Sequence, residues 1–156
     1  MGSNERVYLS GYADGEGCFT VTFNRSERHK FCWDIRPSFS VSQNADRAEV
    51  LEIFRRTFGC GSIRPDRSDR TLKYEVRSVQ ELVSQVLPHF EQFPLLSSKQ
   101  KDFERFAAIV QLMHRGEHLS SEGFAQIVKI AEDLNSASKK RYQRSEIVPI
   151  SNRVKA

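Results

Sequence analysis

Two stretches of the chain alternate between hydrophobic and polar positions. Residues 18–24 and 33–43 place a nonpolar side chain at every second position. Because successive side chains of a β-strand point to opposite faces, this period predicts two half-buried strands. Residues 62–67 and 71–77 show the same period over shorter runs and predict two more. Pro37 cannot donate a hydrogen bond to a neighbouring strand, which indicates an edge or a bulge there.

Elsewhere, hydrophobic residues recur every three to four positions, which is typical of amphipathic helices. This period predicts helices around residues 5–14, 46–58, 78–87, 97–113 and 121–135. Three of these helices are predicted to begin with a capping box, in which two side chains satisfy free N–H groups reciprocally. The boxes are Asp46 with Glu49, Ser78 with Glu81, and Ser97 with Gln100.

The predicted order of elements is α-β-β-α-β-β-α, with further helices after the fourth strand. Such an order predicts an α+β domain in which a four-stranded antiparallel sheet carries helices on one face. A chain of 156 residues with 38% hydrophobic content fits one such domain. We expect it to span residues 5–138, followed by a basic C-terminal tail at residues 139–156. In the first helix we expect a buried stripe of Val7, Tyr8, Gly11 and Tyr12.

The composition narrows the possible partners and compartments. No hydrophobic run approaches the roughly 20 residues that cross a bilayer, so we expect no membrane partner. The three cysteines, Cys18, Cys32 and Cys60, form no Cys-x-x-Cys pair. Their odd number favours reduced thiols in an intracellular protein, with the compartment left open.

The charges are distributed unevenly along the chain. Residues 25–77 hold 12 Lys and Arg against 8 Asp and Glu, and residues 139–156 hold 6 against 1. The helical residues 78–138 hold 5 against 8. This division indicates that one face of the protein binds a polyanion. The alternative is a solvated surface on which Lys and Arg residues cluster by chance. The polar strand face would fit the DNA major groove, where its side chains can reach base edges, or it would simply be solvated.

Two acids, Asp14 and Glu16, lie where the first helix should end, although the partial negative charge of a helix C-terminus disfavours carboxylates. Gly11 and Gly15 are four residues apart on one helix face and leave room for a second backbone. A two-fold axis beside that face would bring two copies of the acids together, and Mg²⁺ between carboxylates and phosphates would relieve their repulsion. The alternative is a glycine-capped helix end with two solvated acids.

The stretch LSGYADGEG, from Leu9 to Gly17, resembles the LAGLIDADG motif of homing endonucleases. Leu9, Gly11, Asp14 and Gly17 match the motif, and Glu16 replaces its final Asp, a familiar variant. The resemblance covers most of the chain and implies the αββαββα fold of that family. The later matching segments are CFTVTF, FSVSQ, GCGSI, YEVRSVQELV, FPLLSSKQKDF and EHLSSEGFAQIVKIAEDLN.

The resemblance also implies roles for particular residues. Glu16 would bind the catalytic metal, with the backbone carbonyl of Gly15 as a further ligand. Lys99 matches a basic residue beside the active site, and Gln43 matches a residue that positions the attacking water. Asp14 would have a supporting role.

The family's sheet lies in the major groove with its concave face towards DNA, which implies a set of DNA-binding residues here. Arg36 and Arg64 are the expected guanine readers, because Arg can donate two hydrogen bonds to O6 and N7. The full set is Thr20, Thr22, Asn24, Asp34, Arg36, Ser38, Ser40, Ser42, Arg47, Ser62, Arg64, Asp66, Lys73, Glu75 and Arg77.

The implied activity is hydrolysis of both strands of a long, near-palindromic DNA duplex, leaving short 3′ overhangs. The resemblance implies Mg²⁺ or Mn²⁺ as cofactor, with Ca²⁺ as a non-catalytic substitute, and no small-molecule substrate. A chain with one motif implies a homodimer, joined through Tyr8, Gly11, Tyr12 and Gly15. The alternative is a relative that binds nucleic acid without cutting it, either an RNA maturase or a DNA-binding regulator.

Overall fold

The first helix leads directly into the first strand. Helix α1 (Ser3–Glu16) ends at Gly17, which is already extended, begins strand β1 (Gly17–Arg25) and donates its N–H to the carbonyl of Ala13. A Cβ atom at Gly17 would lie 2.7 Å from that oxygen, so a side chain does not fit there without a shift. The computed structural model describes residues 2–66, 70–134 and 142–147.

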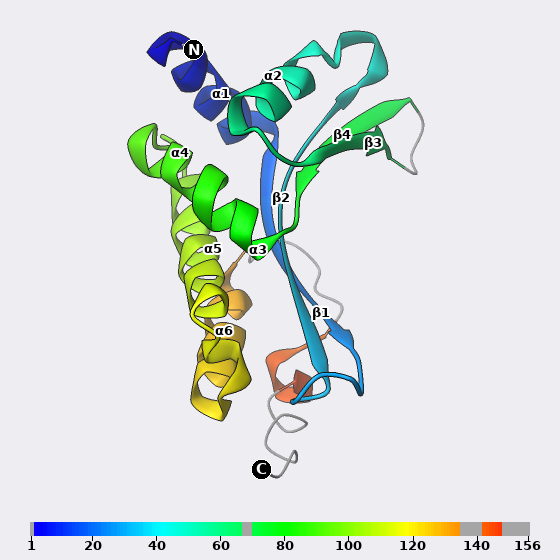
Figure 1. The fold of residues 1–156 in the computed structure, drawn as a ribbon, viewed down its shortest axis with the longest axis vertical. Helices are drawn as coiled ribbons and strands as arrows, with labels where there is room; N and C mark the ends of the chain where they lie inside the picture. Colours follow the sequence, from blue (N-terminus) through cyan, green and yellow to red (C-terminus); the bar gives the residue numbers. More distant parts are fainter. Residues whose placement is uncertain (1, 67–69, 135–141, 148–156) are drawn as a thin grey trace.

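The sheet contains the four predicted strands in the order β1-β2-β4-β3 (Figure 1). Strand β1 pairs with β2 (Trp33–Asn44), and β4 (Thr71–Val76) lies between β2 and β3 (Ser62–Pro65). All three pairings are antiparallel. Pro37 pairs with Val21 of β1, but the pairing of β2 with β4 ends at Phe39, so the other side of β2 is an edge at Pro37. The prediction of an edge at this proline is confirmed.

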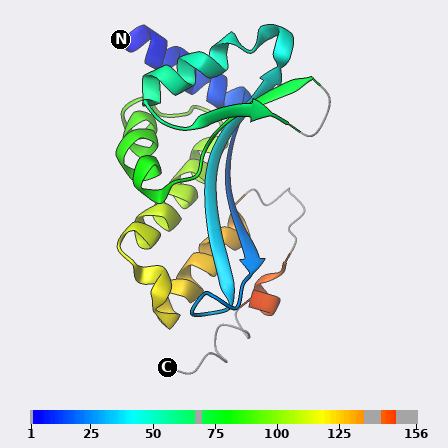
Figure 2. The same ribbon diagram turned by 45° about the vertical axis from the view of Figure 1, so that its right-hand side comes forward.

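The helices gather on one face of the sheet, as predicted (Figures 1 and 2). Helix α5 (Lys99–His114) contacts β1, and α2 (Glu49–Phe58) contacts β2, β3 and β4. No helix in the described part of the chain is long and apolar enough to cross a membrane. The helical elements that follow β2 are, in chain order, η1 (Ala45–Arg47), α2 (Glu49–Phe58), α3 (Val79–Glu81), the π-helical turn η2 (Leu82–Val86), α4 (Leu87–Gln92), α5 (Lys99–His114), η3 (Glu117–Leu119) and α6 (Ser121–Asp133).

Aromatic rings fill the space between the sheet and the helices. Phe19 of β1 and Phe39 of β2 are cross-strand partners whose ring centroids lie 5.1 Å apart. Both rings contact Phe90 of α4, and Phe19 also contacts Phe103 and Phe106 of α5. Burial of each such ring contributes about 2 kcal/mol of stability. The strand positions are those that the alternation assigned to the core.

The predicted buried stripe of α1 is wrong for three of its four residues in the isolated chain. Leu9, Ser10 and Ala13 face the core, whereas Val7 and Tyr8 are 57% and 54% exposed and Gly11 is also exposed. Tyr12 is half-buried, and its ring packs against Phe54 with 6.2 Å between centroids. The helix carries small or hydrophobic residues on two of its sides, and periodicity alone selected mostly the side that faces outward.

Only one of the three predicted capping boxes has the expected hydrogen bond to its first side chain from the N–H three residues later. Ser78 accepts a hydrogen bond from the N–H of Glu81 at the start of α3. The box at Asp46 is wrong, because η1 intervenes and α2 begins without a side-chain cap. At α5 the hydroxyl of Ser97 accepts from a helix N–H, but the Gln100 side chain binds an earlier N–H of the loop instead of closing the box.

Part of the predicted C-terminal tail packs against the domain. The ring of Tyr142 meets Trp33 edge-on at 4.7 Å between centroids, and Ile147 is buried. Residues 135–141 and 148–156 lie outside the described residues. The domain boundary at residue 138 therefore stays a prediction.

Candidate nucleic-acid interface

Cross-strand pairing brings most of the predicted DNA-facing residues onto the sheet face that the helices leave uncovered. Directly paired residues of neighbouring strands point to the same side. The pairs are Thr20 with Ser38, Thr22 with Arg36, Asn24 with Asp34, Ser40 with Glu75, Ser42 with Lys73, Ser62 with Glu75, and Arg64 with Lys73. Asp66 and Arg77 directly follow β3 and β4, and Arg47 is exposed in η1 beyond the end of β2.

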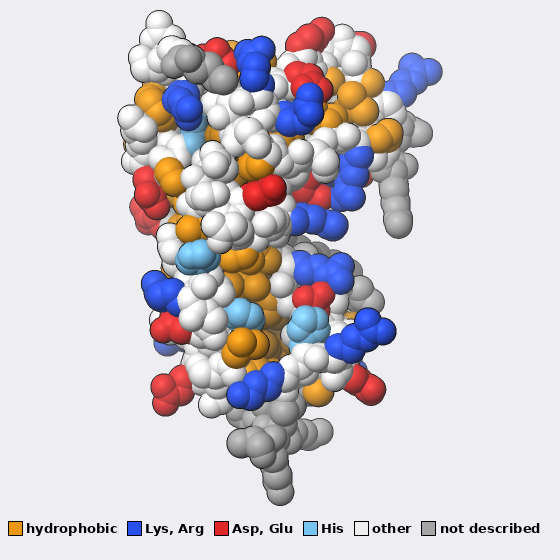
Figure 3. Space-filling model, viewed as in Figure 1, with side chains coloured by type: hydrophobic (Ala, Val, Ile, Leu, Met, Phe, Trp, Pro, Cys, Tyr) orange, Lys and Arg blue, Asp and Glu red, His pale blue; other side chains and the backbone are white. Residues whose placement is uncertain are grey.

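Basic side chains line this side of the molecule. Figure 3 shows several Lys and Arg side chains along the sheet side, at the right of the view. The side chains of Arg36, Arg64 and Arg77 are 57%, 50% and 57% exposed. A half-exposed guanidinium keeps donors available for phosphate oxygens or base edges.

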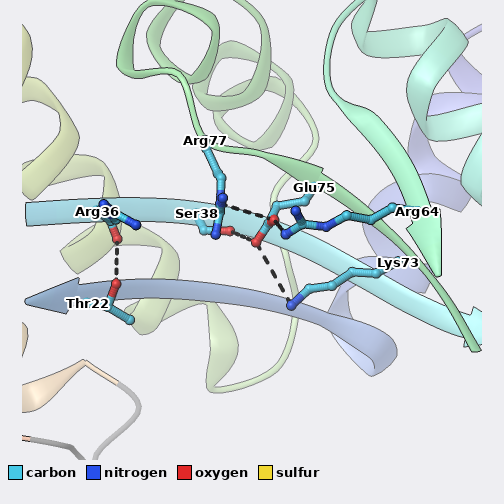
Figure 4. Close-up of polar contacts among 7 residues, drawn as sticks. All are labelled: Thr22, Arg36, Ser38, Arg64, Lys73, Glu75 and Arg77. Carbon is cyan, nitrogen blue, oxygen red and sulfur yellow. Dashed lines mark hydrogen bonds and ion pairs between the residues drawn. The ribbon is translucent and has the colours of Figure 1, made fainter. Parts of the chain in front are cut away.

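Glu75 differs from these residues because its side chain is only 7% exposed. Its Oε1 accepts from Nη2 of Arg64 and lies 3.2 Å from Nε of Arg77 (Figure 4). Its Oε2 accepts from the hydroxyl of Ser38 at 2.7 Å and lies 3.9 Å from Nζ of Lys73. Burial of a carboxylate is costly unless it is paired, and here three cations and a hydroxyl supply the partners. These five residues, the Glu75 cluster, carry a net charge of about +2.

A second carboxylate–arginine pair lies further along β2. Asp34 Oδ2 is 2.6 Å from Nε of Arg36, and its Oδ1 is 3.5 Å from Nε2 of His29. Thr22 donates a long hydrogen bond of 3.4 Å to the backbone carbonyl of Arg36. Both predicted guanine readers, Arg36 and Arg64, are thus held by a carboxylate on the same sheet face.

The end of α1 presents an exposed carboxylate beside a partly buried contact with α5. Glu16 and Gly15 are exposed. Nζ of Lys99, the first residue of α5, donates to the carbonyls of Ala13 at 3.2 Å and Gly17 at 2.6 Å. A cation at these carbonyls favours the helix end, where partial negative charge accumulates. Lys99 therefore holds in place the junction between α1 and β1, which lies directly beside Glu16 in the sequence.

Asp14 is fully engaged in holding the loop before α5. Its carboxylate accepts from the N–H groups of Leu96 and Ser97, each at 3.0 Å, and from the Ser97 hydroxyl. Partial burial acts to raise the pKa of Asp14, but these hydrogen bonds and the charge of Lys99 outweigh it and lower that pKa. The geometry agrees with a supporting role for Asp14.

Gln43 lies on the opposite sheet face from the polar set. It pairs with Leu72 near the end of β2, and its Nε2 donates to the hydroxyl of Tyr12 in α1. Its Oε1 accepts from the N–H of Asn44 at 2.8 Å. Gln43 is thereby tied to α1, the same helix that ends at Glu16.

One copy of the chain offers few ligands for a metal ion. The described residues contain no group of three or more His, Cys, Asp or Glu that could hold one. Asp14 is occupied by the loop, so Glu16 is the motif carboxylate that remains exposed. Carboxylate oxygens are ligands that hard divalent cations prefer, and Glu16 offers them to solvent where α1 joins β1.

Sequence analysis did not identify His89, which is 2% exposed in α4. The Ser10 hydroxyl donates to the carbonyl of Phe93 at 2.6 Å, so it accepts from Nε2 of His89, 3.0 Å away. Nδ1 of His89 has no partner among the described residues. Burial, reinforced by the charge of Arg6, lowers the pKa of His89 to about 4. The only available signal was a lone histidine in the hydrophobic run LVSQVLPHF.

The chain is similar in sequence and in structure to known endonucleases. A family model described as "LAGLIDADG endonuclease" matches residues 9–110. "Probable intron-encoded endonuclease 2" of Neurospora crassa is 31% identical over 146 residues, covering 92% of this chain and 32% of that protein. The chain thus spans about a third of that relative's length.

Two solved structures match over nearly their full length. The crystal structure of the homing endonuclease I-TnaI has a TM-score of 0.82 and 31% identity, with 96% of this chain and 97% of that chain covered. The archaeal intron-encoded homing endonuclease I-Vdi141I, complexed with DNA, has a TM-score of 0.88 and 25% identity, with 96% and 95% covered.

Proposed function

The chain belongs to the LAGLIDADG endonuclease family, and on that premise we propose that it is a site-specific endonuclease that cuts duplex DNA. One observation carries the proposal: a one-sided polar sheet face rich in exposed arginines is joined without a loop to a helix that ends in an exposed Glu16. The first part supplies DNA recognition and the second supplies a ligand for chemistry at the phosphate. The named relatives are endonucleases, which supports the same activity.

The active unit in this proposal is a homodimer formed through the outward side of α1. Val7 and Tyr8 are exposed there, and Gly11 and Gly15 have no heavy atom within 4 Å of where a Cβ would lie. Small residues four apart allow two helices to approach closely. A two-fold axis along this side would place two copies of Glu16 together and two sheets over successive halves of a near-palindromic site.

The residues at this helix end fit a divalent ion, for which Mg²⁺ or Mn²⁺ is the proposed species and Ca²⁺ a non-catalytic substitute. Glu16 would hold it through its carboxylate, together with the carbonyl of Gly15. When bound, such an ion activates water for attack and stabilises charge on the phosphate oxygens. Lys99 keeps positive charge at the α1–β1 junction, which favours the charge that develops on the scissile phosphate. Gln43, fixed through Tyr12, would orient the attacking water.

A relative that binds without cutting is the alternative, and it is not favoured. The family model and the named relatives are endonucleases, and the motif keeps an acid, Glu16, where the family has its final Asp. An RNA maturase or a DNA-binding regulator would not need that acid.

The decisive experiment compares cutting with binding. Wild-type protein incubated with a randomised duplex library and Mg²⁺ should release products with short 3′ overhangs, whereas Glu16→Gln should bind the same sites and cut at least about 100-fold more slowly. Glu49→Gln, the same chemical change at an exposed acid of α2, is the matched control and should cut normally. Specific binding by wild type without any cutting would refute the endonuclease proposal.

A further inference from the structure

Glu75 occupies the centre of the polar sheet face. Its directly paired neighbours on β2 and β3, Ser40 and Ser62, are both short. The longer side chains of Arg64 in β3, Lys73 in β4 and Arg77 directly after β4 extend over its carboxylate. Because the serines leave space and the cations close it, an acid on the uncovered face of the sheet is buried.

This burial argues against direct base reading by Glu75, which the resemblance places in the DNA-binding set. A carboxylate that accepts from cytosine must offer an oxygen to the groove. Glu75 is 7% exposed, and each of its oxygens already has partners within the cluster. The side chains of Arg64 and Arg77 are the parts of the cluster that remain half-exposed.

We infer that Glu75 is a positioning residue, which holds Arg64 and Arg77 in the orientation in which they read bases of the major groove. This inference rests on the proposed function. A guanidinium has two edges of donors, so it can bind a carboxylate with one edge and guanine O6 and N7 with the other. Anchoring the side chains beforehand reduces the rotamer freedom that they lose on binding.

The charge of Glu75 has a second effect on recognition. Three cations gathered on one face would repel one another and would each be drawn to the nearest phosphate, whatever the sequence. The carboxylate lowers the charge of the Glu75 cluster from about +3 to about +2 and holds the cations together. Glu75 therefore favours discrimination between sites over unspecific attraction to the DNA backbone.

The test is a binding selection from a randomised duplex library in Ca²⁺, which leaves the DNA uncut. For Glu75→Gln we expect discrimination to fall about 5- to 100-fold at the base pairs whose preference is also lost in Arg64→Lys and Arg77→Lys. Unspecific affinity should rise, and the slope of log K against log salt should steepen by up to about 0.9. Ser38→Ala keeps the charge but removes one anchor, so it should weaken discrimination at the same base pairs without changing the slope. Glu52→Gln, the same charge change on exposed α2, should alter neither quantity.

Three results would overturn the inference. One is a changed preference at a single base pair that neither arginine variant affects, which would make Glu75 a direct reader. Another is unchanged discrimination between sites in both Glu75→Gln and Ser38→Ala. If both variants also lose thermal stability, the role of Glu75 is structural. The third is wild-type binding without any consensus. A protein that selects a consensus but does not cut it in Mg²⁺ would refute the endonuclease proposal alone.

Discussion

Mild acid should destabilise this protein through one buried histidine. His89 of α4 contacts Ser10 of α1, and its ring packs against Phe58 and Phe90 at 5.0 Å and 4.8 Å between centroids. Its Nε2–H donates to the Ser10 hydroxyl, and no described residue could accept a hydrogen bond from a protonated Nδ1. Protonation would place a charge in this apolar site, which burial and the charge of Arg6 both oppose.

The sign and size follow from the two pKa values. The pKa of His89 is about 4 in the folded protein against 6.5 for a free histidine, so the unfolded chain takes up the proton first. The contribution to stability is full above pH 6.5 and is lost as the pH falls towards 4. The total is about 3 kcal/mol, of which about 2 kcal/mol is lost between pH 7.5 and pH 5. For a domain of this size that loss lowers Tm by about 4–8 °C.

Calorimetry or circular dichroism of wild type and His89→Gln across this pH range measures the effect. The variant should be less stable at neutral pH but should lose much less Tm on acidification, because glutamine does not titrate. His118, whose pKa is also lowered, first by burial and then by the charge of His29, provides the comparison. His118→Gln should keep the part of the pH dependence that His89 causes. If His89→Gln loses as much Tm as wild type between pH 7.5 and pH 5, the assignment to His89 is wrong.

Three further substitutions test the helix that ends at Glu16. Gly17→Ala should lower the free energy of unfolding by about 1–3 kcal/mol, because its Cβ would lie 2.7 Å from the carbonyl oxygen of Ala13; a urea titration with an unchanged midpoint would contradict this. Gly15→Ala meets no atom within 4 Å in one chain, so it should leave monomer stability within about 0.5 kcal/mol and weaken the proposed dimer; sedimentation showing a dimer of unchanged affinity would count against that interface. Asp14→Ala removes the acceptor of two N–H groups and the Ser97 hydroxyl and should cost about 1–3 kcal/mol in the same urea titration, so stability equal to wild type would show that the loop does not depend on it.

The fold was predictable where one physical rule dominated a segment. The alternation in β1 and β2 located both strands, because one face of each is packed against aromatic rings and the other is not. The same alternation grouped the polar face correctly, since antiparallel pairing preserves the side of each residue. The edge at Pro37 followed from the missing N–H alone.

The rest depended on contacts between residues far apart in the sequence. The orientation of α1 is decided by what packs against it, so the pattern could not tell which of its two nonpolar sides is buried. The burial of Glu75 requires the register that brings Arg64 and Ser38 beside it, 11 and 37 residues away. Asp14 meets Ser97 across 83 residues, and no local rule relates the two.

Helix α1 and strand β1 are joined without a connecting loop, which fixes the angle between the helix and the sheet. Glu16 ends the helix and Gly17 begins the strand, while Lys99 binds carbonyls on both sides of this corner. The angle between helix and sheet therefore cannot relax through a hinge. In a pair of copies joined along α1, that angle would set the distance between the two reading faces, and each base pair added between half-sites would displace one of them by about 3.4 Å. The α1–β1 junction would then determine the length of the recognised site. Recognition of half-sites at a different spacing would require a substitution at this junction rather than on the polar sheet face.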